Sequence, residues 1–187
     1  MLELGTLAPA FKLPDVVSGK TLGLNDVAAG QPVLVMFLSR HCPYVQHVKK
    51  ELAKLSQDYR GKAIGVVAIA SNYVPEYPQD APDSLREFAL EEGFAFPICF
   101  DESQQVAKEY KAACTPDFFL FDAERRLAYR GQLDGSRPNS GIPVTGADLR
   151  AAMDAVLAGH APSPEQRPSL GCNIKWRKGN EPAYFGV

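Results

Sequence analysis

One cysteine stands where two residue patterns meet, in "SRHCPYVQHVKKELAKL" (39–55). An apolar run ends just before Cys42, and a helical pattern begins at Pro43. Ligands of open α/β sheets bind at the carboxyl ends of strands, where a helix N-terminus presents unpaired N–H groups and its positive dipole end. Arg40 and His41 add positive charge nearby. These features favour the thiolate, which attacks disulfides and peroxides, so Cys42 is the predicted nucleophile rather than a buried structural cysteine.

A partner thiol is missing from the place where dithiol redox motifs carry it. The residue three positions after Cys42 is Val45, and the other cysteines are scattered, so neither a zinc framework nor a disulfide framework is indicated. Cys172 is the first internal candidate for a resolving thiol, because it lies in a tail that can fold over the domain, and Cys114 is the second. Either Cα atom would have to lie within about 7 Å of that of Cys42. For Cys172 and Cys114, the alternative to a resolving role is an ordinary packed or surface thiol. Cys99, in an apolar strand, is expected in the core.

The elements that must position these residues follow the order strand–helix–strand–helix–strand, then a hairpin and a last helix. Continuous apolar runs predict buried strands, and apolar residues every three or four positions predict helices. Asp80 or Asp83 is available to cap the second helix, and Asp101–Gln104 resembles a capping box for the third. The predicted strands are 32–38, 63–70, 94–100 (near an edge), 116–122 and 127–133, and the predicted helices are 43–59, 83–93, 104–113 and 147–159. A parallel β-α-β unit before an antiparallel hairpin implies an α/β fold with a mixed central sheet and helices on both faces.

Bulk properties exclude several classes of function. The 187 residues suit one domain, and the formal net charge of −2 points to neither nucleic acid nor an anionic membrane surface. The longest apolar runs are too short to span a bilayer, and the start shows no signal peptide, so a cytoplasmic location is expected. The last segment, 160–187, is rich in Pro and Gly but holds Trp176, Tyr184 and Phe185, which suggests a tail that packs on the body.

Four stretches of the sequence carry a family resemblance. "APAFKLPDVVSGKTLGLNDVAAGQPVLVMFLSRHCPYV" resembles the opening of the alkyl hydroperoxide reductase/thiol-specific antioxidant (peroxiredoxin-like redoxin) branch of the thioredoxin superfamily. "ACTPDFFLFD" resembles that superfamily's Thr-cis-Pro-strand segment. "GCNIKWRKGNEPAYF" and "SNYVPEYPQDAP" resemble a bacterial subgroup, marked by "HCPYV" and "GCNIKW", without a settled substrate. The resemblance implies a thioredoxin-like redoxin domain over 1–159, with 160–187 packed on the same domain.

The resemblance also places a loop beside the nucleophile. Thr115 and Pro116 match the superfamily's cis-proline motif, so their peptide bond is expected to be cis. The backbone of Thr115 would then offer strand-like hydrogen bonds to a bound chain and bring a substrate near Cys42.

The peroxiredoxin pattern is matched only in part. Ser39 stands where peroxiredoxins carry Thr or Ser to help hold the peroxide, but relatives in the bacterial subgroup have a cysteine there. Ser39 is therefore either a peroxide ligand or the remnant of a lost thiol, and both interpretations stay open. Peroxiredoxins have a proline seven residues before the cysteine, and this chain has Val35 there. They also carry an arginine near the site, in the region where this chain has Thr115 and Pro116. Arg40 or Arg130 could substitute for it.

The leading hypothesis is a thiol-dependent oxidoreductase, acting through Cys42 by hydroperoxide reduction or by monothiol disulfide exchange. Its substrate would be a hydroperoxide or a protein disulfide, and an external thiol, thioredoxin-like or glutathione-like, would reduce it. No cofactor is implied, and no metal site is predicted, because His41 and His47 are six residues apart on one segment. The alternative is a catalytically weakened thioredoxin-fold module that binds extended peptide segments through the Pro116 loop.

Overall fold

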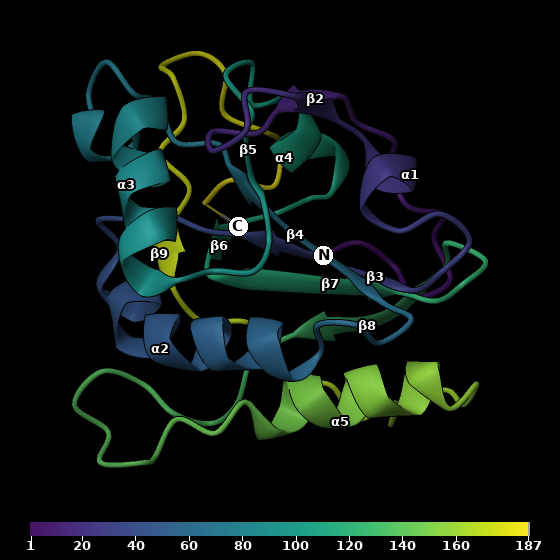
Figure 1. The fold of residues 1–187 in the computed structure, drawn as a ribbon. Coiled ribbons are helices and arrows are strands. Elements are labelled where there is room, and N and C mark those ends of the chain that lie inside the picture. The colour runs from purple at the N-terminus through teal and green to yellow at the C-terminus, as the bar shows by residue number, and fades with distance from the viewer. Residues whose placement is uncertain (187) are drawn as a thin grey trace.

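Five strands form the central sheet of the computed structural model, which describes residues 1–186 (Figure 1). Their order in the sheet is β5 (Ile98–Phe100), β4 (Gly65–Ala70), β3 (Val33–Phe37), β7 (Asp117–Phe121) and β8 (Leu127–Gly131). β3, β4 and β5 are parallel, whereas β7 and β8 run antiparallel. This mixed sheet confirms the predicted α/β fold, and β5 lies at an edge as the sequence predicts.

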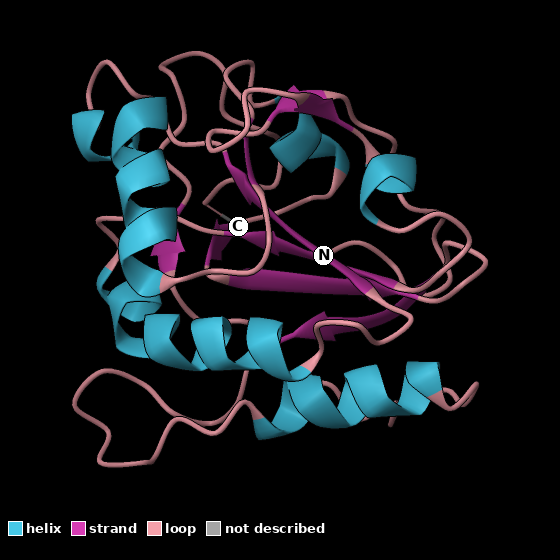
Figure 2. Cartoon of the chain, viewed as in Figure 1, coloured by secondary structure: helices cyan, strands magenta, loops and turns pink. Residues whose placement is uncertain are grey.

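Helices cover both faces of the sheet (Figure 2). Three pack on one face: α2 (Pro43–Asp58), α3 (Pro82–Glu92) and α5 (Ala147–Leu157). Two short helices, α1 (Leu24–Val27) and α4 (Gln105–Glu109), pack on the other. Within residues 1–186, none of the helices has the length and apolar character that crossing a membrane requires.

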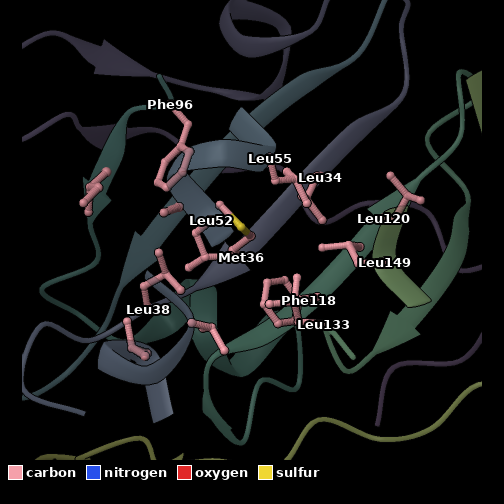
Figure 3. Packing of buried hydrophobic residues seen from close by; sticks show 14 of the residues in the cluster. Leu34, Met36, Leu38, Leu52, Leu55, Phe96, Phe118, Leu120, Leu133 and Leu149 are labelled. Carbon is pink, nitrogen blue, oxygen red and sulfur yellow. The ribbon is translucent and has the colours of Figure 1, made fainter. Parts of the chain in front are cut away.

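Alternate residues of β3 enter different cores, because successive side chains of a strand point to opposite faces. Leu34 and Met36 pack with Leu52 and Leu55 of α2, as Figure 3 shows. Val33, Val35 and Phe37 enter the second core, which also holds residues of the C-terminal tail. β3 is fully buried, which explains its uninterrupted apolar sequence.

Short elements complete the fold and hold the tail. β1 (Leu13–Pro14) pairs with β2 (Thr21–Leu22), and η1 (Pro78–Asp80) is a single 3₁₀ turn. β6 (Cys114–Thr115) pairs antiparallel with β9 (Cys172–Asn173). Two tail side chains beyond β9, Ile174 and Trp176, are buried in the second core. The division of the chain at residue 159 stays a prediction.

Both predicted helix caps are wrong. The N-cap of α3 is Ala81, which makes no side-chain capping bond, because the carboxylate of Asp80 is used by more distant segments. α4 begins at Gln105 and has no capping box. Its N-cap residue is Gln104, whose backbone is in the left-handed region. The carboxylate of Asp101 still accepts two N–H groups of the first turn, from Val106 and Ala107, although Asp101 is not the N-cap residue. α4 also ends at Glu109, shorter than the predicted helix over 104–113.

Candidate active site

Cys42 lies at the N-terminus of α2, just beyond the carboxyl end of β3. It is the N-cap residue, with extended backbone, and Pro43 occupies the first helical turn, where its missing N–H costs no hydrogen bond. The side chain is buried, with 1% of its surface exposed, and its Sγ donates to the carbonyl oxygen of Thr115 at 3.2 Å. The peptide bond between Thr115 and Pro116 is cis, as predicted. The predicted nucleophile and the predicted cis-proline segment are therefore in direct contact.

The tail brings a second thiol to the same place. In the ladder between β6 and β9, Cys172 lies opposite Thr115, whose carbonyl binds Cys42. Burial, and to a lesser extent the neighbouring Cys42 thiol, raises the pKa of the Cys172 thiol to about 11. Within residues 1–186 all four cysteines are free thiols. Cys42 and Cys172 are therefore both next to Thr115, and the resolving role of Cys172 stays a prediction.

The other two cysteines do not lie opposite Thr115. Cys114 is buried and its Sγ lies 3.7 Å from the carbonyl oxygen of Pro116; burial, and to a lesser extent nearby negative charge, raises the pKa of its thiol. In the ladder Cys114 lies opposite Asn173, so it alternates to the other side from Cys172. Cys99 lies in the core, as expected, and burial raises the pKa of its thiol to about 12.

A buried carboxylate fixes the segment that leads into Cys42. Asp80, with 1% of its surface exposed, accepts the Arg40 backbone N–H at 2.7 Å on one oxygen. Its other oxygen accepts the Ser39 hydroxyl at 2.7 Å and the Asn72 amide at 2.6 Å. The carboxylate thus ties the end of β3, the loop after β4 and η1 together beside the nucleophile.

The side chains of His41 and Arg40 both contact the segments that follow β4: His41 contacts Asp80, and Arg40 contacts α3. Nδ1 of His41 lies 3.2 Å from an Asp80 oxygen and 3.2 Å from the Ser39 hydroxyl, and its ring stacks on Tyr77. The guanidinium of Arg40 binds Ser84 and two glutamates of α3, at 3.1 and 3.2 Å. Its positive charge is therefore paired on α3.

The two arginines considered as substitutes for a peroxiredoxin arginine are both bound elsewhere. Arg130 donates to the carbonyl oxygen of Leu2 near the N-terminus, and Arg40 binds α3. Neither guanidinium has a hydrogen bond to Cys42 in the part of the chain that the structure describes. Ser39 is fully buried and its hydroxyl donates to Asp80, so this contact belongs to the scaffold of the site.

The sequence did not identify Asp80 and Asn72 as site residues. The position of Asn72 was the available signal: it comes two residues after the end of β4, as Ser39 comes two residues after the end of β3. Because carboxyl ends of neighbouring parallel strands meet at one edge of a sheet, polar residues after β3 and β4 belong together. Asp80 comes from a third segment, and its part in the site depends on how the loop after β4 folds back.

We expect Asp80→Asn to lower the free energy of unfolding by about 2–3 kcal/mol, because an amide NH₂ in place of one carboxylate oxygen leaves a buried donor unpaired. Urea unfolding of the reduced protein measures this effect. Asp83→Asn, on the exposed first turn of α3, is the matched control and should change the free energy by less than about 0.5 kcal/mol. Equal effects of the two substitutions would contradict the assigned role of Asp80.

A second carboxyl follows the cis-proline. Burial raises the pKa of Asp117 to about 7, against the opposing effect of hydrogen bonds from the Ala113 N–H and the Ser169 side chain. The folded protein therefore holds this proton up to near-neutral pH, whereas an unfolded chain releases it near the ordinary value for Asp. The charge of Asp117 thus changes around neutrality, two residues after Thr115.

A small pocket opens beside the cis-proline, between the start of α2 and the segment after β8. Its lining includes Tyr44, His47, Pro116, Arg137 and Leu170. Nε2 of His47 lies 2.7 Å from the Ser136 hydroxyl, which joins α2 to that segment. Within residues 1–186, no group of three His, Cys, Asp or Glu side chains is arranged to hold a metal ion.

Comparisons with known proteins place this chain in a family and identify solved structures with the same fold. Residues 4–130 match the model of the AhpC/TSA family. The chain is 49% identical to an uncharacterized conserved protein from Geobacillus kaustophilus, with a TM-score of 0.92 over 95% of this chain and 94% of that one. It is 47% identical to a hypothetical protein from Sinorhizobium meliloti 1021, with a TM-score of 0.93 over 96% and 97%.

More distant structures share the fold alone. A candidate thiol:disulfide interchange protein, DsbE, from Chlorobium tepidum is 22% identical, with a TM-score of 0.66 over 84% of this chain and 99% of that one. Among curated proteins, none matches this chain.

Proposed function

The chain belongs to the AhpC/TSA family, and on this premise we propose that it is a thiol oxidoreductase in which Cys42 is the nucleophile and Cys172 the resolving thiol. The observation that carries the proposal is the place of Cys172 in the β6–β9 ladder: it lies opposite Thr115, whose carbonyl oxygen accepts the Cys42 thiol at the N-terminus of α2. A resolving thiol at this place would replace the second cysteine that is absent at Val45.

With a hydroperoxide, the Cys42 thiolate attacks the terminal oxygen. An S–O bond forms, the O–O bond breaks, and the alcohol leaves after it takes a proton, so that the sulfur is oxidised to sulfenic acid. The Cys172 thiolate then attacks Sγ of Cys42. A disulfide forms, the S–O bond breaks, and water leaves.

With a disulfide, the Cys42 thiolate attacks one sulfur and releases the other as a thiolate, which leaves a mixed disulfide on Cys42. Cys172 then attacks Cys42 and expels the remaining thiol. Both routes end in the same Cys42–Cys172 disulfide. An external thiol, thioredoxin-like or glutathione-like, returns it to the dithiol, which suits a reducing compartment such as the cytoplasm.

The surroundings support these roles. The Thr115 carbonyl positions Sγ of Cys42 while the thiol is protonated. After the proton leaves, the N-terminus of α2 offers its unpaired N–H groups to the charge of the thiolate. Cys114 is the weaker candidate for the resolving thiol, because it faces the other side of the β6–β9 ladder.

We expect the wild-type protein, treated with stoichiometric hydrogen peroxide, to carry a single Cys42–Cys172 disulfide in peptide mass maps. The closure step should accelerate with rising pH, because burial raises the pKa of Cys172 to about 11 and only the thiolate attacks. A Cys42–Cys114 disulfide would contradict the proposal. So would a protein in which neither peroxide nor a small disulfide produces the Cys42–Cys172 disulfide.

A further inference from the structure

The strand edge beside the nucleophile is occupied by the chain's own tail. β9 pairs antiparallel with β6, so Cys172 lies opposite Thr115, the residue before the cis-proline (Figure 1). The Ile174 N–H continues this pairing and donates to the Ala113 carbonyl at 3.1 Å. An extended polypeptide that reached Cys42 by pairing with Thr115 would need this same edge.

The fit between tail and edge leaves no room for another strand. A Cβ atom added to Gly171 would lie 2.0 Å from the carbonyl oxygen of Thr115, far closer than any non-bonded Cβ contact allows. The two backbones are therefore in contact at the residue before Cys172. Only glycine permits this approach.

The tail is also held beyond the ladder. The Lys175 N–H donates to the Asn72 side chain at 2.8 Å, and the Lys175 carbonyl accepts the Tyr73 N–H at 2.8 Å and the Gln104 amide at 2.9 Å. Ile174 and Trp176 are buried in the second core. To clear the edge at Thr115, these contacts would have to break together.

We propose that residues 171–174 are a specificity element, which occupies the polypeptide-binding edge and restricts the oxidants of Cys42 to small molecules without a backbone to pair. This inference rests on the function proposed above for Cys42. It also opposes the alternative of a peptide-binding module, since that function needs the Thr115 edge to be free. Cys172 takes the place that the sulfur of a bound protein would have.

Two probes with one leaving group test the inference. Both are mixed disulfides of thionitrobenzoate, one with N-acetylcysteine and the other with a flexible peptide of about ten residues that has a central cysteine. The Cys42 thiolate attacks the cysteine sulfur, a new disulfide forms, the probe's disulfide breaks, and the electron pair leaves on coloured thionitrobenzoate. The measured quantity is the ratio of second-order rate constants, peptide over N-acetylcysteine.

For the wild-type protein we expect a ratio of about one, because pairing gives the peptide no advantage. In Gly171→Ala the added methyl group should push β9 away from Thr115 and raise the ratio about tenfold or more. Hydrogen exchange at the Ile174 amide should accelerate in the same variant. Gly135→Ala, outside the tail, has open space at its Cβ and no left-handed backbone, and it should keep the wild-type ratio.

A wild-type ratio of about ten or more would overturn the specificity element, and this result does not depend on any variant folding. So would an unchanged ratio in Gly171→Ala, provided near-ultraviolet circular dichroism shows a folded protein and Ile174 exchanges faster. Release of thionitrobenzoate that persists in Cys42→Ser would instead contradict the proposed function itself. The two failures are therefore distinguishable.

Discussion

Replacing Cys42 with serine is expected to lower hydroperoxide turnover by on the order of a thousandfold or more, since the reacting atom itself is removed. A serine hydroxyl stays protonated at neutral pH, and it forms no disulfide with Cys172. The fold should survive, because the oxygen can still donate to the Thr115 carbonyl that now accepts from Sγ. Dithiothreitol-dependent loss of hydroperoxide measures the effect.

Cys114→Ser is the matched control for this substitution. It removes another buried thiol of the same neighbourhood, one whose Sγ contacts Pro116 rather than Cys42. We expect its turnover to stay within about twofold of the wild-type value. If Cys42→Ser kept its activity while Cys114→Ser lost it, the nucleophile would be assigned to the wrong thiol.

Cys172→Ser is expected to separate the first chemical step from the second. The burst of peroxide consumption by Cys42 should persist, but the sulfenic acid should live on the order of a hundredfold longer, because an adjacent thiol acts at a very high effective concentration. Excess peroxide should then convert Cys42 to the sulfinic acid under conditions that give the disulfide in the wild-type protein. Dimedone trapping and mass spectrometry follow both products.

The same experiment on Cys114→Ser decides between the two candidate resolving thiols. A long-lived sulfenic acid in Cys114→Ser and a short-lived one in Cys172→Ser would transfer the resolving role to Cys114. A short lifetime in both variants would mean that no thiol of this chain resolves Cys42. We expect neither, because Cys172 lies opposite Thr115, whose carbonyl accepts the Cys42 thiol, whereas Cys114 faces the other side of the β6–β9 ladder.

Local pattern was sufficient to place Cys42 at the junction of β3 and α2. The apolar run of β3 and the three-to-four-residue spacing of α2 are short-range features, and they meet at Cys42 in the structure as in the sequence. The order of elements, the mixed sheet and the edge position of β5 follow from the same patterns. The cis bond before Pro116 was predicted from a motif rather than from periodicity.

Local pattern failed where several distant segments share one group. Asp80 looks like a helix cap in the sequence, because it stands just before α3, but its oxygens accept donors from Ser39, Arg40 and Asn72. A buried carboxylate takes the set of donors that satisfies it best, and that set exists only after the loops have folded together. The same reason applies to Arg40, whose charge is paired on α3.

The sequence ranked Cys172 ahead of Cys114 but left both open, and only the tertiary structure places Cys172 opposite Thr115. A two-residue strand such as β9 is too short to leave any periodic signal, and its pairing with β6 joins positions far apart in the chain. The sequence determined that Cys42 lies at a strand–helix junction, because that junction is built from neighbouring residues. Only the packing of the tail, through Gly171 on Thr115 and through its buried side chains, decided that Cys172 lies on this edge and what occupies it.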